Sequence, residues 1–240
     1  MFSISPSKSL LATAIVAGII ASPFTFADEQ EAQYATALTL GSTGIGLEFS
    51  STTNLSFTDN DHIQWRIGIS GADANFDRGD DVEIAGIDYE GNIQWAEARA
   101  GLDWFPSNSG WSEKVFISSG LMYSSGEFDA TADGTKGFAV AGTQVNPGDI
   151  TSFRTEIENQ QVMPYVSVGW GNKITGESGF DFQAELGIRV PTRDADVTLS
   201  AIDPGNVLSP AALAAEKRDI ENDINQDLDG FANIALSYHF

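Results

Sequence analysis

The stretch ANIALSYHF (residues 232–240) decides the fold. Every second residue is apolar, from Ala232 to Phe240, and the residues between them are small or polar. A period of two predicts a β-strand with one apolar face. The ends of soluble domains usually fray in water. We therefore expect this strand, with its aromatic last residue, to lie in a hydrophobic surface.

The same alternation recurs along the chain in segments of about ten residues, which is the length of a tilted transmembrane β-strand. Six further segments show it: 45–49, 63–69, 96–104, 115–123, 162–170 and 180–190. A closed barrel of antiparallel neighbours needs an even number of strands. We therefore assign AQYATALTL (32–40) as a short first strand, joined to the next by a tight turn at Gly41-Ser42-Thr43.

Connection lengths separate a membrane barrel from a soluble sandwich or a lipocalin-like barrel, in which strands also alternate. Short segments (52–60, 106–112 and 172–178) alternate with long acidic ones (72–91, 125–158 and 192–229). Short periplasmic turns and long outer loops are typical of outer-membrane barrels. Aromatic residues flank the short turns, as an interfacial girdle would: Trp65, Trp104, Trp170, Phe180, Tyr238 and Phe240.

The predicted fold is therefore an all-β, transmembrane, antiparallel up-and-down β-barrel of eight strands, with its apolar side outward and both termini in the periplasm.

The N-terminal residues are expected to direct export. Lys8 precedes an apolar run from Leu10 to Ile20, and small residues lead to Ala27. This run is short for a membrane helix and typical of a signal peptide. We assign residues 1–27 to the signal peptide and residues 28–240 to one barrel domain.

Composition narrows the possible partners. The chain has 34 acidic and 12 basic residues, a formal charge of -22, and no cysteine. Such a charge argues against nucleic-acid binding, which requires positive charge at the phosphates. Without cysteine there is no disulfide framework. A hydrophobic content of 42% argues against a disordered acidic chain.

Charged residues occupy positions that alternate with the apolar ones and should face the lumen. They are Glu48, Arg66, Glu97, Arg99, Asp103, Asp181, Glu185 and Arg189. One interpretation is a polar conduit, whose five acids against three arginines favour cationic or zwitterionic solutes. The other is a salt-bridged plug, because buried charges must be paired and an eight-stranded barrel has little free volume.

The last long connection is predicted to contain a short helix. Ser209 is suited to the N-cap, Pro210 to the first helical position and Gly230 to a stop. An apolar stripe at helical spacing should pack on the barrel rim. It comprises Leu213, Ile220, Ile224 and Leu228.

Nothing in the sequence indicates catalysis. The chain has two histidines, His62 and His239, and no serine forms a recognisable motif with either. We predict that the protein is not an enzyme and has no metal site and no cofactor.

Four stretches resemble the CarO-type outer-membrane proteins, a family associated with carbapenem resistance. They are GSTGIGLEF (41–49), AEARAGLDWFP (96–106), MPYVSVGWGNK (163–173) and ELGIRVPTRDADVTLS (185–200). The resemblance implies a monomeric eight-stranded barrel with a proposed role in the uptake of small and basic amino acids. It implies no catalytic residues.

The alternating residues at the C-terminus also match the signal by which the barrel-insertion machinery recognises bacterial outer-membrane proteins. These residues are Ile234, Leu236, Tyr238 and Phe240. The expected location is the outer membrane of a Gram-negative bacterium, with outer-membrane lipid, lipopolysaccharide and the insertion machinery as partners. Two functions remain open: a narrow channel for small cationic or zwitterionic solutes, and a closed barrel with a structural or surface-interaction role through its long acidic loops.

Overall fold

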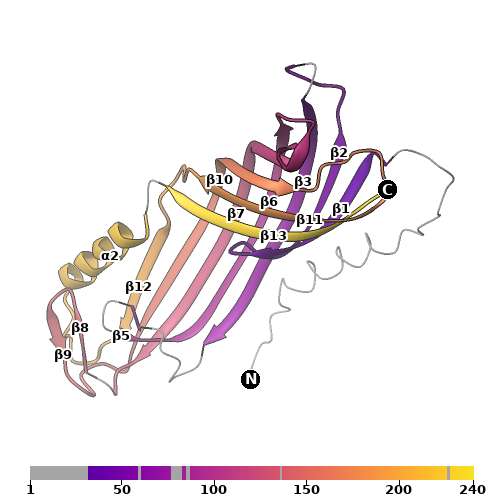
Figure 1. Cartoon of the computed structure of the whole chain (residues 1–240). Helices are drawn as coiled ribbons and strands as arrows, with labels where there is room; N and C mark the ends of the chain where they lie inside the picture. The colour runs from indigo at the N-terminus through magenta and orange to yellow at the C-terminus, as the bar shows by residue number, and fades with distance from the viewer. Residues whose placement is uncertain (1–31, 59–60, 77–82, 85–86, 136, 226–227) are drawn as a thin grey trace.

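The structure, a computed structural model, describes residues 32–58, 61–76, 83–84, 87–135, 137–225 and 228–240. The predicted signal peptide lies outside these residues. Eight antiparallel strands close into a barrel, because β11 pairs with both β10 and β13 (Figure 1). The barrel strands are β1 (Tyr34–Gly41), β2 (Gly44–Thr52), β3 (His62–Phe76), β6 (Glu90–Phe105), β7 (Val115–Asp133), β10 (Ser152–Gly171), β11 (Gly179–Arg189) and β13 (Asp229–His239).

The predicted first strand is confirmed as β1, which lies between β13 and β2. Its ladder with β2 runs from Tyr34 opposite Ser51 to Gly41 opposite Gly44, which leaves two residues for the turn. Gly44 has φ +89°, a left-handed conformation that glycine adopts without steric cost. On its other side β1 pairs with β13. The first and last strands therefore close the barrel side by side.

Burial in the barrel is reversed relative to a soluble protein. The outward side chains Leu38, Leu186 and Leu236 are 58%, 63% and 55% exposed, whereas the inward side chains Gln64 and Arg66 are 0% and 1% exposed. An apolar outer wall around a polar interior is the arrangement of a transmembrane barrel. The sequence prediction of fold class and orientation of the apolar face is confirmed.

An unbroken chain of aromatic rings runs around part of the outer wall near the short connections. The ring centroids of Trp65 and Phe49 are 5.4 Å apart, those of Phe49 and Tyr34 are 5.8 Å apart, and those of Tyr34 and Phe240 are 6.0 Å apart. The chain continues from Phe240 through Tyr238 to Phe180. Tyr34 and Phe49 belong to this girdle and were not predicted from the sequence.

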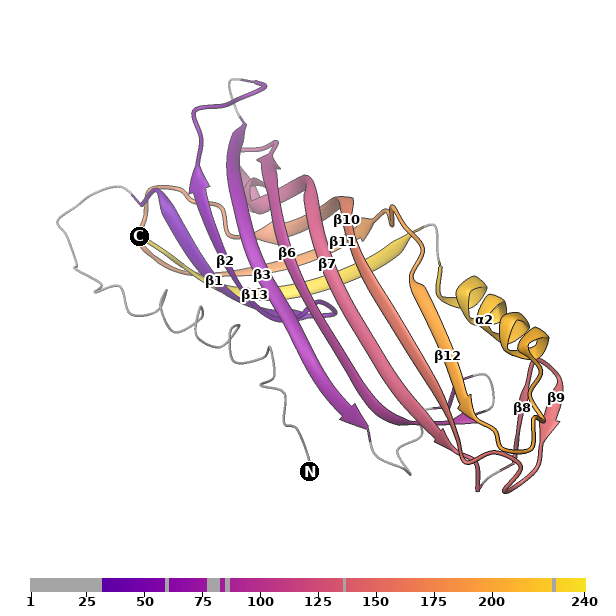
Figure 2. The ribbon, with the colours of Figure 1, turned by 180° about the vertical axis from the view of Figure 1, so that it is seen from behind.

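The bounds predicted for the long loops were wrong, because β3, β6, β7 and β10 continue past the closed barrel (Figures 1 and 2). β7 has 19 residues and β10 has 20, and they pair from Asp133 opposite Ser152 to Val115 opposite Trp170. A ninth strand, β12 (Asp196–Ile202), pairs with the first part of β10. On β10 the exposed apolar residues begin at Val162, whereas the backbone ladder already starts at Ser152.

This extension of the sheet forms an external module with its own apolar core. Helix α2 (Pro210–Ile224) and a small hairpin, β8 (Phe138–Val140) with β9 (Thr143–Val145), accompany it. The smaller elements are β4 (Glu83–Ile84), β5 (Ile87–Asp88) and the 3-10 helix η1 (Gly110–Lys114). The buried core residues are Tyr89, Ala130, Ala132, Phe138, Val140, Val145, Ile150, Phe153 and Leu208. Phe153 is ten residues from Met163 on β10, so this core lies on the face that continues the lumen lining.

The start of the predicted helix is confirmed and its end was wrong. The Ser209 hydroxyl accepts a hydrogen bond of 3.1 Å from the Ala212 amide, and Pro210 begins the helix. The helix ends at Ile224, and Gly230 belongs to β13. α2 contacts β12 and β8. It therefore covers the external module, whereas the sequence predicted packing on the barrel rim.

Only part of the predicted apolar stripe is used. Leu213 packs against the module core and Ile220 is buried, whereas Ile224 and Leu228 are exposed. No helix among the described residues is long and apolar enough to cross a membrane.

Candidate functional site in the barrel lumen

The strand period places all eight charged lumen candidates on the inward face. Six are buried: Glu48, Arg66, Glu97, Arg99, Asp103 and Glu185. Arg189 and Asp181, which lies near one mouth of the barrel, are half-buried. These residues come from β2, β3, β6 and β11 and form three groups along the lumen.

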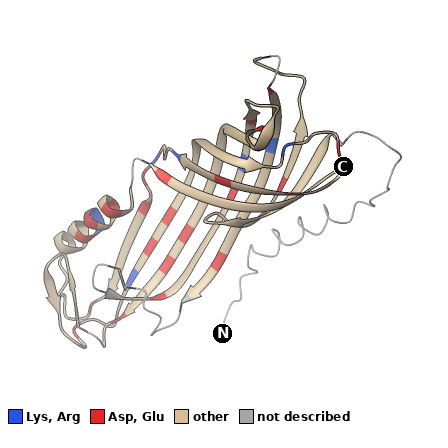
Figure 3. Ribbon diagram, viewed as in Figure 1, with Lys and Arg blue, Asp and Glu red and all other residues tan. Residues whose placement is uncertain are grey.

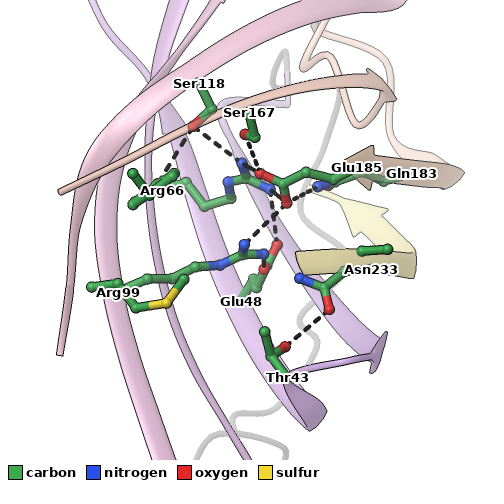
Figure 4. Close-up of polar contacts among 12 residues, drawn as sticks. Thr43, Glu48, Arg66, Arg99, Ser118, Ser167, Gln183, Glu185 and Asn233 are labelled. Carbon is green, nitrogen blue, oxygen red and sulfur yellow. Dashed lines mark hydrogen bonds and ion pairs between the residues drawn. The ribbon is translucent and has the colours of Figure 1, made fainter. Parts of the chain in front are cut away.

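The central group is organised around Arg66 of β3 (Figure 4). Its Nη2 donates to Asp103 Oδ1 and to Glu185 Oε1, both at 2.9 Å. Its Nη1 donates to Glu48 Oε2 at 3.4 Å and to Glu185 Oε2 at 3.1 Å. The guanidinium also lies 5.3 Å from the ring centroid of Phe116. A single cation thus links strands β2, β3, β6 and β11 across the lumen.

Arg99 of β6 completes the central group. It pairs with Glu48 and, at 3.0 Å, with Glu185 Oε2. Glu185 therefore receives hydrogen bonds from both guanidinium groups, and it also accepts one of 2.6 Å from Ser167 (Figure 4). Charge-assisted hydrogen bonds of this kind are the strongest that side chains form. Three carboxylates face two guanidiniums, which leaves one negative charge in excess.

A second ion-pair group lies towards the external module. Arg189 of β11 pairs with Glu97 of β6, and its Nε donates to Asp229 Oδ2 of β13 at 2.6 Å. Glu97 Oε2 is buried and has no hydrogen-bond partner among the described residues. This group therefore also has more carboxylates than cations.

A third group lies at the mouth near the short connections. Lys114 Nζ is 2.8 Å from Asp181 Oδ1, and Asp181 Oδ2 accepts from the Asn172 amide at 3.0 Å. The Asn172 side chain is hydrogen-bonded to His239 at 3.1 Å. The backbone carbonyl of Asn172 accepts a hydrogen bond of 3.0 Å from the side-chain amide of Gln64. Gln64 lies 3.5 Å from Asp103. Polar contacts thus run from this mouth to the central group.

Large side chains occupy much of the remaining lumen. Met122, Met163, Tyr165 and Phe231 form a buried apolar cluster beside the ion pairs. Beside Glu48 and Arg99 there is a cavity of only about 10 Å³, roughly the space of one water molecule. An eight-stranded barrel is just wide enough for its interior to be filled by side chains. Among the described residues, the lumen is filled by side chains in this way.

Two charged members of these groups, Lys114 and Asp229, were not predicted from the sequence. Both could have been found by extending the alternation past the apolar segments. Lys114 shares the parity of inward Phe116, and Asp229 shares that of inward Phe231. Lys114 is the last residue of η1 and Asp229 is the first residue of β13. Both therefore lie just outside the apolar segments from which the strands were predicted.

The four C-terminal residues assigned to the sorting signal lie on the outward face. Ile234, Leu236 and Phe240 are exposed, and Tyr238 contacts the rings of Phe180 and Phe240. Recognition by the insertion machinery stays a prediction.

Among the described residues, no three His, Asp or Glu side chains gather in a way that could hold a metal ion.

No family model and no curated protein matches the chain. The solved structure of CarO from Acinetobacter baumannii matches with a TM-score of 0.57 and 19% identity, over 86% of this chain and 97% of that one. CarO2 from A. baumannii matches with a TM-score of 0.58 and 16% identity, over 88% of this chain and all of that one. At these identities the likeness establishes the fold, and it confirms the resemblance seen in the sequence. The chain therefore has the fold of the CarO-type outer-membrane β-barrels.

Proposed function

We propose that this protein is a closed barrel of the Gram-negative outer membrane, and that it serves a structural or surface-interaction role through its external module. The observation that carries the proposal is the contact set of Arg66. One guanidinium, 1% exposed, bonds three carboxylates from three other strands. Passage of a solute would require these charge-assisted bonds to break in a confined space.

The external module supports the second half of the proposal. Acidic residues lie along its extended strands, as the red bands in Figure 3 show, and Glu127, Glu158 and Asp196 are exposed. Glu127 stands opposite Glu158, and Glu158 stands opposite Asp196. Like charges directly opposite one another destabilise a sheet. Such a face is therefore better suited to interaction with cationic groups than to stabilising the sheet.

The proposal includes an orientation and partners. Both ends of the described chain lie at the short-connection end, where Gln33 and Tyr34 donate backbone hydrogen bonds to Phe240. With short turns in the periplasm, both termini are periplasmic and the external module faces outward. The partners are then outer-membrane lipid, lipopolysaccharide around the module and the insertion machinery, and the protein is a monomer without enzymatic activity.

A second candidate function is a narrow uptake channel for small cationic or zwitterionic solutes, such as the basic amino acids that the family resemblance implies. The excess of carboxylates over cations in the central and outer ion-pair groups favours it. This function would require a conformation in which the groups rearrange.

Solute flux into liposomes containing the folded protein separates the two functions. Ornithine, glycine and glutamate are compared, and empty liposomes and a general porin are the controls. The closed barrel predicts flux no greater than that of empty liposomes for all three solutes. Flux that prefers ornithine and weakens in Glu97→Gln and Glu185→Gln would overturn it and establish the channel.

A further inference from the structure

Two of the short connections carry large apolar side chains that the barrel does not bury. Leu55 and Phe57, between β2 and β3, are 60% and 76% exposed, and Trp111 in η1 is 78% exposed. All three lie outside the strands, beyond the apolar wall of the barrel. In water, such side chains would expose apolar surface at an energetic cost.

The connection between β2 and β3 is fastened to the outside of the barrel. Asp61 Oδ2 accepts hydrogen bonds from the Phe57 amide at 2.9 Å and from Trp104 Nε1 at 2.8 Å. The rings of Phe57 and Trp104 meet edge to face, with centroids 6.0 Å apart. Trp104 pairs with Ile63 and Ile117 in the barrel wall. Phe57 therefore extends the aromatic girdle beyond the last barrel residues.

The connection between β6 and β7 makes a similar contact on another strand. The Trp111 carbonyl accepts a hydrogen bond of 3.2 Å from Trp170 Nε1. Trp170 lies on the outward face of β10 and is 37% exposed. The Lys114 ammonium lies 5.4 Å from the Trp170 ring centroid. Trp111 is thus held beside an outward-facing tryptophan of the girdle.

We propose that Leu55, Phe57 and Trp111 form an interfacial anchor that inserts into the phospholipid headgroup layer at the short-connection end of the barrel. This inference rests on the proposed membrane placement of the barrel. The ring of Phe57 contacts that of Trp104, and the backbone of Trp111 is hydrogen-bonded to the Trp170 indole, so both connections adjoin the lipid-facing surface. Tryptophan and phenylalanine at this level have apolar rings in the bilayer, and the tryptophan indole N–H can remain hydrated.

The occupant of this surface is a phospholipid layer and not a protein, because both contacts are made sideways onto the lipid-facing wall. A protein docked beneath the barrel would not cover the Phe57 ring beside Trp104 or the segment bonded to the Trp170 indole. The anchor would fix how deeply the barrel sits in the membrane, at the end opposite the external module.

The test uses the intrinsic fluorescence of the five tryptophans. The folded protein is placed in vesicles of phosphatidylethanolamine and phosphatidylglycerol containing phosphatidylcholine brominated near the headgroup, and iodide is the aqueous quencher. The variants are Trp111→Phe, with Trp170→Phe as the girdle control and Trp95→Phe, which shares the inward parity of Glu97 on β6, as the control away from lipid. We expect Trp111→Phe and Trp170→Phe each to lower the share of emission quenched by brominated lipid, and Trp95→Phe to raise it.

Phe57→Trp supplies a gain of signal at the other connection. The added tryptophan should increase the lipid-quenched emission and leave the iodide-quenched emission unchanged. The inference is overturned if Trp111→Phe raises the lipid-quenched share and Phe57→Trp adds iodide-quenched emission, because both connections would then face water and be free for a protein partner. If Trp170→Phe also fails to lower the lipid-quenched share, the membrane placement of the barrel itself is wrong.

Discussion

At the scale of single residues, Arg66 is the cation on which the lumen depends. Removing it would leave Glu48, Asp103 and Glu185 buried, with Arg99 as the remaining cation of the central group. Breaking a buried ion pair by removing one partner costs about 3–5 kcal/mol, because a charge is left uncompensated in a medium of low dielectric constant. Replacing a whole buried pair costs much less. Loss of one member therefore destabilises the network more than loss of a matched pair.

We predict that Arg66→Ala lowers the free energy of unfolding by about 3–5 kcal/mol, measured by urea titration in detergent micelles. The matched control is Arg154→Ala, which breaks ion pairs to Asp129 and Glu156 on the exposed sheet extension. Exposed pairs contribute about 0.2–1 kcal/mol. Equal effects of the two substitutions would contradict the central role of Arg66.

Gly187 of β11 makes room for the ring of Phe231 on the neighbouring strand. A methyl group at Gly187 would overlap this ring and come 2.7 Å from Ser167 Cβ. We predict that Gly187→Ala destabilises the barrel by about 1–3 kcal/mol through overpacking. Gly126→Ala is the control, because its nearest atom is 4.0 Å away. A stability loss no larger than that of the control, in the same urea titration, would show that the lumen cluster is loosely packed.

At the scale of elements, the strands show which parts of the sequence carry enough signal for prediction. The membrane-crossing half of β10 alternates clearly, with Val162, Val166 and Val168 outward. Its external half, from Ser152 to Gln160, has polar residues on its outward face and continues the same ladder. Alternation reports contact with lipid and therefore marks only the membrane part of each strand. Backbone pairing has no comparable signature in the residues.

Helix α2 was predictable at its start and not at its end for a related reason. The Ser209 and Pro210 pair has a defined capping chemistry. The C-cap Asn225 has φ -84°, so the chain leaves the helix without the left-handed glycine that a stop signal would require. Gly230 instead pairs with Ile188 in the barrel.

Loss of the N-cap should loosen α2 without opening the barrel. We predict that Ser209→Ala destabilises the helix by about 1 kcal/mol, seen as faster hydrogen exchange at the Leu213 amide. Ser209→Asp keeps a side-chain acceptor and should restore protection. Unchanged exchange in Ser209→Ala would mean that packing against the module core, and not the cap, determines the stability of the first turn.

At the scale of the whole molecule, a filled barrel and an external module share one sheet. The alternation of charges pointed to eight side chains on the inward face, although Lys114 and Asp229 were missed. It could not predict which of them pair, because strand stagger determines which residues from non-adjacent strands meet. Arg66 and Glu185 are 119 residues apart in the chain and lie on strands that are not neighbours. The sequence alone therefore could not separate a conduit from a plug.

The most direct test of a closed lumen is the conductance of the folded protein in a planar lipid bilayer, compared with that of the paired variant Arg66→Ala, Glu185→Ala. This variant removes one cation and one carboxylate, so the charge excess of the central group is kept while its centre is emptied. We predict that the wild-type protein shows no steady conductance above the bare bilayer and that the paired variant conducts. Steady conductance steps from the wild-type protein would contradict the central claim that ion pairs close this barrel.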